Sequence, residues 1–381
     1  MTAVYDAIVI GVGAMGSATC HELAKRGCKV LGLEQFGIPN ENGSSGGEPR
    51  LIRLAYFEHP DYIPLLQKTY RLWDELSERT GEKQVTLTGG VYLGPEDGVL
   101  VSGVVKAAEK YQLGVERLDR AEVVQRCGPF VVPEDYTAVY EAEMGFIRPQ
   151  EAIAAFAKLA VEHGAVLHTE ETVTDWSADC SGVRVRTNRD EYTAAKLVFC
   201  AGAWTAPLLC DIGVRLEVTR QVMFWVSPKT NLETFRCPPF GCWAVEEDAP
   251  GREGVYYGFP MLSDHTGMKL GCHEPGSSTS PEALQRTVTD SDEHTVRATL
   301  ERFLPGANGP LVSAKVCMYT LSPDEHFIVD KYPLHENVVI ACGFSGHGFK
   351  FAPVVGEALA DLALNGESKL PIGFLRLNRF R

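Results

Sequence analysis

The feature that most constrains this chain is a glycine-punctuated turn near its N-terminus, Gly11-Val-Gly-Ala-Met-Gly16. The apolar run 4–10 before it is typical of a buried parallel strand, residues 14–26 have a helical pattern, and residues 29–33 predict a second strand. A strand, a helix and a parallel strand joined by GxGxxG form the unit that holds a dinucleotide pyrophosphate at the helix N-terminus. We therefore expect an α/β domain of the Rossmann type.

Each glycine of the turn has a task that a side chain would prevent. Gly11 permits the tight turn, Gly13 lets the backbone approach the pyrophosphate, and Gly16 lets the helix pack on the strand. Glu34 follows the second strand, where an acidic side chain accepts hydrogen bonds from a ribose, which favours an adenosine with a free 2′-hydroxyl. A glycine-rich turn that binds nothing is the alternative, and the strand–helix–strand context argues against it.

Length, charge and cysteine content narrow the class of protein. The 381 residues suffice for two or three domains, and 45% hydrophobic residues suffice for a core. A net charge of −14 disfavours nucleic acid and anionic membranes as partners. The eleven cysteines show no CxxC spacing, which argues against a metal site or a disulfide framework. Because a strand begins close to the N-terminus and no apolar run approaches about 20 residues, we expect a cytoplasmic protein without a membrane segment.

The pattern changes along the chain in a way that predicts two domains. Residues 216–316 are rich in strand signals, aromatics, Pro and Gly, which is typical of a mostly antiparallel sheet. An apolar strand predicted over 197–204 contains Ala201 and Gly202 and resembles a second element of a nucleotide-binding domain. We predict a discontinuous nucleotide-binding domain of residues 1–84, 146–215 and 317–381, and a second domain of residues 85–145 and 216–316.

Several side chains are candidates for chemistry from their type and position alone. Arg50 and Arg53 are three residues apart, so they would share a face if their segment were helical; two solvated surface charges are the alternative. Alternation along a strand-like run places Lys269 and His273 on one face. Ordinary packing could explain His273 and Tyr257, but a lysine that faces inward from a strand is less ordinary.

A second glycine-rich stretch, residues 343–350, precedes a helix predicted over 351–365. Its glycines bring a helix N-terminus close to a neighbouring group. The exposed N–H groups and the helix dipole favour an electron-rich or anionic partner there.

A set of motifs resembles, in order along the chain, those of the monomeric sarcosine oxidase family of flavoenzymes: GVGAMG with Glu34, SSGGEPRLIRLAY, YYGFP, MKLGCH, KVCMYTLSPDEHFIVD and GFSGHGFKFAPVVGE. The match spans nearly the whole chain. The resemblance implies an FAD-binding domain of the glutathione-reductase-like kind beside a substrate domain. It also implies oxidation of a secondary amino acid at its C–N bond, hydrolysis of the imine, and reduction of oxygen to hydrogen peroxide.

The resemblance further implies roles for individual residues. Lys269 matches the lysine that promotes oxygen reduction, and Arg53 and Lys350 match the pair that holds the substrate carboxylate. Cys317 matches the cysteine that bonds covalently to FAD. Residues that match the lining of the substrate cavity are Tyr257, His273 and Tyr319, and those that match the cofactor site are Gly11, Gly13, Gly16, Glu34, Ser44, Ser45, Arg50, Ala201, Gly202, Cys317, Gly343, Gly346, Gly348 and Lys350.

One position departs from the family pattern. The family commonly has a histidine near the flavin where this chain has Gly46. The substrate stays open among sarcosine, pipecolate, proline-like and larger N-alkyl amino acids, with O2 as the second substrate of a monomeric enzyme. A flavin dehydrogenase that passes electrons to a protein or quinone is the main alternative, and Lys269 argues against it. A non-catalytic FAD- or NAD-binding scaffold and a nicotinamide dehydrogenase are less favoured.

Overall fold

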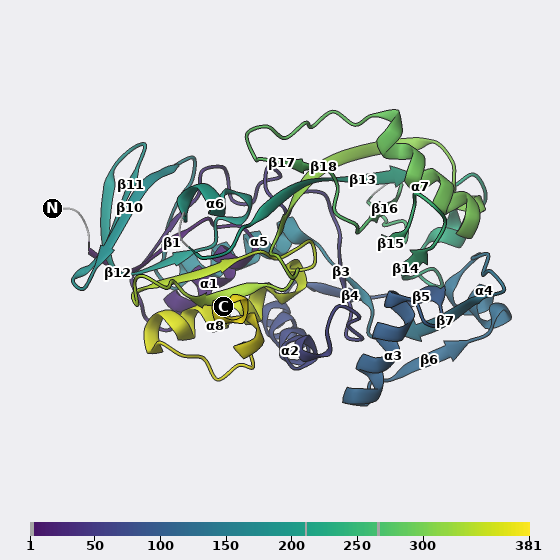
Figure 1. Ribbon diagram of the computed structural model, residues 1–381, viewed down its shortest axis with the longest axis horizontal. Coiled ribbons are helices and arrows are strands. Elements are labelled where there is room, and N and C mark those ends of the chain that lie inside the picture. Colours follow the sequence, from purple (N-terminus) through teal and green to yellow (C-terminus); the bar gives the residue numbers. More distant parts are fainter. Residues whose placement is uncertain (1–3, 210–211, 265–266) are drawn as a thin grey trace.

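The computed structural model of the chain describes residues 4–209, 212–264 and 267–381. Two large β-sheets dominate it, one at each end of the long axis (Figure 1). The strands β13 and β18 belong to the second sheet and extend toward the first, so they join the two halves.

The first sheet has a parallel centre. Its strands run in the order β10-β11-β12-β1-β2-β9, while β20 pairs with β12 and β19 with β20. The strand β1 pairs in parallel with β12 and β2, β2 pairs in parallel with β9, and β12 with β20. The β10–β11 hairpin and the β19–β20 pair are antiparallel. The bounds are β1 Val4–Ile10, β2 Val30–Leu33, β9 Val166–His168, β10 Val173–Asp179, β11 Gly182–Thr187, β12 Glu191–Phe199, β19 Ile328–Lys331 and β20 Val338–Cys342.

Three helices cover one face of this sheet. The helix α1 (Ala14–Lys25) packs between α5 (Pro149–Glu162) and α8 (Ala352–Asn365). Alternate residues of β1 enter different cores: Ala7 and Val9 pack in the cluster that contains these helices, while Ile8 and Ile10 pack in the cluster on the other face. A strand buried on both faces explains the continuous apolar run at the start of the chain.

The second sheet is mostly antiparallel, as the sequence predicts. Its order is β17-β13-β16-β15-β14-β5-β7-β6, β18 pairs with β13, and β14–β5 is its one parallel pair among the described residues. The bounds are β5 Gly90–Pro95, β6 Val115–Leu118, β7 Tyr136–Glu141, β13 Glu217–Val226, β14 Cys242–Glu247, β15 Gly254–Gly258, β16 Met268–Cys272, β17 Ser278–Thr279 and β18 Leu311–Leu321.

A small sheet decides the conformation of the segment with Arg50, which the sequence left open. Its strands are β3 (Arg50–Ile52), β8 (Gly145–Ile147) and β4 (Val85–Leu87). Since Arg50 pairs with Ile147 across β3 and β8, the segment is a strand, and Arg50 and Arg53 do not share a helix face. Pairing with a distant strand decided the conformation, and the local sequence does not contain that information.

One correction concerns the strand predicted over 197–204. It starts earlier, as β12, and stops at Phe199; the 3₁₀-helix η2 (Gly202–Trp204) follows. The positive φ of Gly202 marks this change of direction. The remaining α-helices are α2 Ile63–Thr80, α3 Val99–Tyr111, α4 Arg120–Cys127, α6 Thr205–Leu208 and α7 Asp290–Phe303, and the remaining 3₁₀-helices are η1 Pro60–Tyr62, η3 Leu232–Phe235, η4 Pro305–Ala307, η5 Phe349–Phe351, η6 Gly373–Leu375 and η7 Leu377–Phe380.

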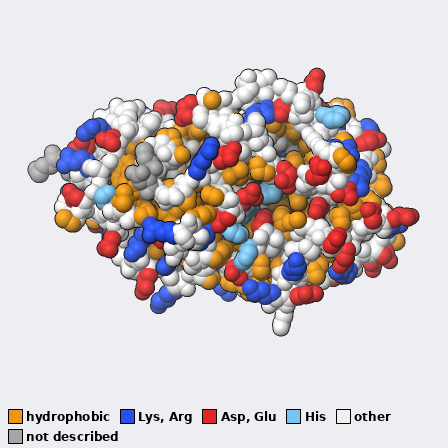
Figure 2. All heavy atoms as spheres, viewed as in Figure 1, with side chains coloured by type: hydrophobic (Ala, Val, Ile, Leu, Met, Phe, Trp, Pro, Cys, Tyr) orange, Lys and Arg blue, Asp and Glu red, His pale blue; other side chains and the backbone are white. Residues whose placement is uncertain are grey.

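The charged side chains on the surface and the cysteines show no unusual arrangement in the described residues. On the face in Figure 2, basic and acidic side chains are interspersed rather than gathered by sign. Within the described ranges, no helix is long and apolar enough to cross a bilayer. The ten cysteines in those ranges are free thiols.

Candidate active site

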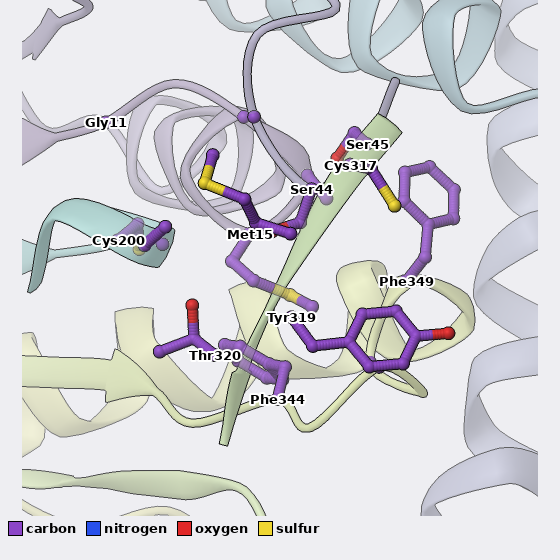
Figure 3. Close-up of a pocket in the computed structure, with 18 of the residues that line it drawn as sticks. Gly11, Met15, Ser44, Ser45, Cys200, Cys317, Tyr319, Thr320, Phe344 and Phe349 are labelled. Carbon is purple, nitrogen blue, oxygen red and sulfur yellow. The ribbon is translucent and has the colours of Figure 1, made fainter. Parts of the chain in front are cut away.

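A cavity of about 370 Å³ runs between the two sheets. Its lining includes Gly11 and Glu34 from the first sheet and Tyr257 and His273 from the second. Figure 3 shows the middle of this cavity, where the turn after β1, the strand β18 and the loop before α8 approach one another. One continuous space thus touches both predicted parts of the site.

The turn after β1 leaves the N-terminus of α1 open. Gly11 has a φ of +84°, and a Cβ on Gly16 would lie 1.7 Å from the Gly11 carbonyl oxygen, so both positions require glycine. A Cβ on Gly13 would meet nothing within 4 Å. No side chain caps α1 and no acidic residue lies in its first turn. Free N–H groups and the positive end of the dipole therefore face the cavity, an arrangement that suits a pyrophosphate.

Glu34 is held beside this turn. Its carboxylate accepts hydrogen bonds from the N–H groups of Val12 at 2.9 Å and Phe36 at 3.0 Å. Burial raises the pKa of Glu34, and these N–H donors oppose that rise. The side chain is thus fixed at the edge of the cavity, where a ribose hydroxyl could donate to it.

The loop before β3 is organised by two cations. The Arg50 guanidinium donates to the carbonyl oxygens of Ser44, at 3.0 Å, and Gly47. The Lys269 ammonium donates to the same Gly47 oxygen at 3.1 Å and also to Pro49. Lys269 is 2% exposed, so the inward-facing lysine is confirmed, and burial, with the Arg50 charge next, moves its pKa well below the usual value. Arg50 lines the cavity, whereas Lys269 lies behind the loop and is not among the lining residues.

The same loop explains the departure at position 46. A Cβ on Gly46 would lie 2.6 Å from the Glu41 carbonyl oxygen and 3.2 Å from the Glu41 Cα. Backbone atoms cannot move aside as a flexible side chain can. A histidine therefore does not fit here unless the loop changes its path.

Cys317 and Tyr319 project from one face of β18 into the cavity (Figure 3). Cys317 is 3% exposed and packs with Met223 and Trp225. Burial raises the pKa of its thiol, and the charges of Arg50 and Lys269 oppose that rise. The thiol thus has the cationic neighbours that a thiolate needs.

Arg53 and Lys350 come together around one aromatic ring. The Arg53 Cζ lies 4.3 Å and the Lys350 Nζ 5.2 Å from the centroid of Tyr56. The Tyr56 hydroxyl donates to His347 Nδ1, since the other ring nitrogen lies 3.1 Å from the Glu325 carbonyl and is the N–H donor there. Burial with the nearby Arg53 charge lowers the pKa of Lys350 to about 7.

Arg53 is also paired with a carboxylate that the sequence analysis did not select. Its guanidinium donates to Glu58; the Arg53 side chain is buried, and the Glu58 side chain is 13% exposed. Burial opposes ionisation of Glu58, but the charge of Arg53 prevails and lowers its pKa to about 2. Any other carboxylate that binds Arg53 must therefore share it with Glu58 or displace Glu58.

The aromatic wall of the cavity is contiguous with these cations. His273 Nδ1 lies 3.4 Å from the Tyr319 hydroxyl, and the ring of His273 lies 6.3 Å from that of His347. Burial lowers the pKa of His273 to about 4 and raises that of Tyr257 to about 12. Both groups are neutral at physiological pH, so the wall carries no charge of its own.

Glu141 supports this region from behind. One of its carboxylate oxygens accepts from the N–H groups of Leu54 and Ala55, the latter at 3.1 Å, directly after Arg53. Its other oxygen accepts the Tyr92 hydroxyl. Glu141 is distant in sequence from these partners and has no motif around it, so the sequence offered no signal for it.

Sequence reasoning also missed part of the lining. The Thr320 hydroxyl is buried and makes no hydrogen bond with any described residue, yet it borders the cavity (Figure 3). An open helix terminus, a ribose-type acceptor and an unused hydroxyl along one space fit a dinucleotide cofactor. This space is also lined by residues that the resemblance assigns to the cofactor site, Ser44, Ser45, Ala201, Gly202, Gly343, Gly346, Gly348 and Lys350, and by four that the sequence analysis did not name, Met15, Cys200, Phe344 and Phe349.

Comparison with known proteins gives consistent results. A family model described as "FAD dependent oxidoreductase" matches residues 6–362. The chain is 43% identical over 377 residues to a monomeric sarcosine oxidase of Streptomyces avermitilis, a match that covers 98% of this chain and 97% of that protein. It is 36% identical to an N-methyl-L-tryptophan oxidase of Salmonella dublin, with 99% of each chain covered. The solved structure of NikD, an amino acid oxidase essential for nikkomycin biosynthesis, superimposes with a TM-score of 0.87 at 28% identity, covering 98% of each chain.

Proposed function

The chain belongs to the family of FAD dependent oxidoreductases that includes the monomeric sarcosine oxidases and N-methyl-L-tryptophan oxidases, and from this premise we propose that it oxidises the C–N bond of a secondary amino acid. The family membership predicted from the motifs is thereby confirmed. One observation carries the proposal: two buried cations, Arg53 and Lys350, flank one tyrosine ring in a cavity that continues to an open dinucleotide turn.

FAD fits the nucleotide end of the cavity. The α1 N-terminus would hold the pyrophosphate and Glu34 the ribose. When bound, FAD supplies a hydride acceptor. We assign the first sheet and its helices to the FAD-binding domain and the second sheet to the substrate domain; the boundaries drawn from the sequence stay a prediction, and β18 of the second sheet extends past the predicted boundary at residue 317.

Arg53 and Lys350 bind and orient the substrate carboxylate. Arginine offers a rigid pair of donors and lysine adds a point charge. The amine must be neutral so that its lone pair can assist the departure of hydride. The uncharged wall of Tyr257, His273 and Tyr319 disfavours an ammonium by desolvation.

The overall reaction balances with oxygen as the second substrate. For an N-methyl amino acid, the amine, O2 and water give the demethylated amino acid, formaldehyde and hydrogen peroxide. We assign to Lys269, in its protonated form and from its place behind the loop at Gly47 and Pro49, the positive charge that favours electron transfer to O2. A dehydrogenase that uses a protein or quinone acceptor is the alternative, and it predicts substrate oxidation without peroxide. We retain the cytoplasmic location and the monomeric state as predictions.

Peroxide release tests this function. The purified holoenzyme is mixed with secondary amines that do or do not carry a carboxylate, and peroxide is followed with a coupled peroxidase. We expect peroxide with the amino acids and little with their decarboxylated analogues. Equal rates for the two groups would contradict the roles of Arg53 and Lys350.

Covalent attachment of FAD through Cys317 is a separate part of the proposal. The thiol projects into the cavity with Arg50 and Lys269 among the charges around it. Acid denaturation and centrifugation decide the question. A yellow pellet that becomes colourless in Cys317→Ser supports the bond, whereas a yellow supernatant over a colourless wild-type pellet refutes it.

A further inference from the structure

At Ala244, the lining of the substrate end of the cavity carries only a methyl group. This residue lies on β14 directly opposite Tyr257 of β15 and Tyr92 of β5. Residues opposite each other in paired strands point to the same face of the sheet. Ala244 lines the cavity and is therefore a small residue between two large rings.

The space over Ala244 is apolar. Val255 and Phe259 lie two residues on either side of Tyr257 and line the same cavity, as do Leu51 and Phe57. The Tyr92 hydroxyl donates to Glu141 and Ala55, and Tyr92 is not among the residues that line the cavity. We name the region bounded by Leu51, Phe57, Ala244, Val255 and Phe259 the Ala244 recess.

The recess adjoins the carboxylate anchor. The Phe57 ring forms part of its wall and lies 4.4 Å from Arg53 Cζ. In an α-amino acid, the side chain leaves the carbon that bears the carboxylate. A substrate held by Arg53 therefore brings the first atoms of its side chain next to the recess.

We propose that the Ala244 recess binds an apolar side chain on the α-carbon, so that the enzyme prefers N-methyl amino acids with a branched aliphatic side chain over sarcosine, which has none. This specificity rests on the proposed function, because it assumes that Arg53 binds the substrate carboxylate. One methylene in a fitting apolar pocket changes selectivity by roughly 10-fold or more. A larger side chain at one of the positions that bound the recess would fill it and should remove the preference for the branched substrate.

The test compares kcat/KM for sarcosine and for both enantiomers of N-methylalanine, N-methylvaline and N-methylleucine. We expect an increase along the series, with one enantiomer of N-methylleucine about 10-fold or more above sarcosine. In Ala244→Leu, the ratio of N-methylleucine to sarcosine should fall by about the same factor. Val255→Met fills the recess from β15 and should lower the ratio as well, which keeps the test available if Ala244→Leu does not fold.

A matched control separates the recess from general effects on the sheet. Ala314 lies on β18 and packs against the second core without lining the cavity. Ala314→Leu should leave the ratio unchanged. A wild-type ratio near or below one, or a ratio that Ala244→Leu and Val255→Met do not alter, would overturn the proposal while leaving the oxidase function intact.

Binding without turnover gives an independent readout. In thioether analogues, sulfur replaces the amine nitrogen, so calorimetry measures affinity alone. The analogue with an isobutyl side chain should bind about 10-fold more tightly than the one without a side chain, and Ala244→Leu should abolish this difference. If no N-methyl amino acid were oxidised, the proposed function would fail, and this measurement would still decide for or against the recess.

Discussion

The two ends of the cavity are built by different means. At the nucleotide end, backbone geometry determines the shape of the site: Gly11 and Gly16 have no room for a side chain, and the α1 N-terminus is uncapped. At the substrate end, buried ionisable side chains are held in position by other side chains, as Tyr56 and Glu58 hold Arg53. Local sequence encodes the first kind of structure, whereas contacts between distant segments create the second.

The largest effect of a single substitution should fall on the reaction with oxygen. A cation about 4 Å from superoxide at an effective dielectric near 20 contributes on the order of 4 kcal/mol, or roughly a thousandfold in rate. Lys269→Met should therefore slow re-oxidation by air far more than anaerobic reduction by substrate. Stopped-flow absorbance measures the two half-reactions separately.

Lys315→Met is the control for Lys269→Met, because Lys315 also lies in the second sheet but pairs with Glu41 at the surface. It should leave both half-reactions near their wild-type rates. Equal losses in the two half-reactions of Lys269→Met would show that Lys269 does not act on oxygen.

Removal of one carboxylate anchor should have the next largest effect. Arg53→Met should lose about 1.5–3 kcal/mol of charge-assisted binding, or roughly 10- to 150-fold in kcat/KM. Arg220→Met is the control, since Arg220 pairs with Asp292 and does not line the cavity. An unchanged kcat/KM for amino acids in Arg53→Met would remove Arg53 from the site.

Substitution of a residue that only supports the site should lower activity less than substitution of a residue that contacts the substrate. Glu141→Gln weakens the acceptor for the two N–H groups that follow Arg53, so we expect KM to rise about 10-fold with a smaller change in kcat. Glu247→Gln also removes a buried charge, but its partner Arg302 does not line the cavity. If both variants lose thermal stability and only Glu141→Gln raises KM, Glu141 positions Arg53. The same KM in both would assign Glu141 a structural role only.

The smallest effect concerns pH. Lys350 has a pKa of about 7 in the folded chain, so its charge is present below pH 7 and lost above it. Affinity for a thioether carboxylate, which has no amine to titrate, should fall severalfold as pH rises from 6 to 8. Lys350→Met should show a flat profile, and a profile that stays flat in the wild type would contradict the assignment.

The same shift predicts how Lys350 affects stability. The unfolded chain binds this proton up to the ordinary lysine pKa of 10.5, whereas the folded chain releases it near pH 7. Between these values the unfolded state holds more protons, so the contribution of Lys350 to the free energy of unfolding increases with pH. Denaturant titrations of the wild type and Lys350→Met over pH 7–9 should therefore differ in slope.

The sequence predicted those parts of the molecule that depend on neighbours along the chain. The strand–helix–strand unit, the glycine turn and the antiparallel second sheet followed from local patterns, and motif resemblance supplied the family. The sequence left open whether Arg50 and Arg53 share a helix face or are two solvated charges; the segment is a strand because β3 pairs with β8, and Arg53 is buried. Glu58 and Glu141 were missed because a carboxylate in a loop or at a strand end carries no local sign that it will be buried beside Arg53.

Gly46 shows a limit of motif comparison. The resemblance marked it as a missing histidine, but only the path of the loop shows that the Glu41 backbone occupies the space of a side chain. The Ala244 recess was hidden for a similar reason, since a small residue becomes informative only when its neighbours across the sheet are known.

The central claim is that one cavity joins a flavin site to a site for a secondary amino acid. It is tested most directly by titrating the wild-type holoenzyme with N-methylleucine in the absence of oxygen and then admitting air. We predict loss of the yellow absorbance after one equivalent of substrate, followed by its return with one equivalent of hydrogen peroxide. Absorbance that persists with this and every other N-methyl amino acid, or that returns without peroxide, would contradict the claim.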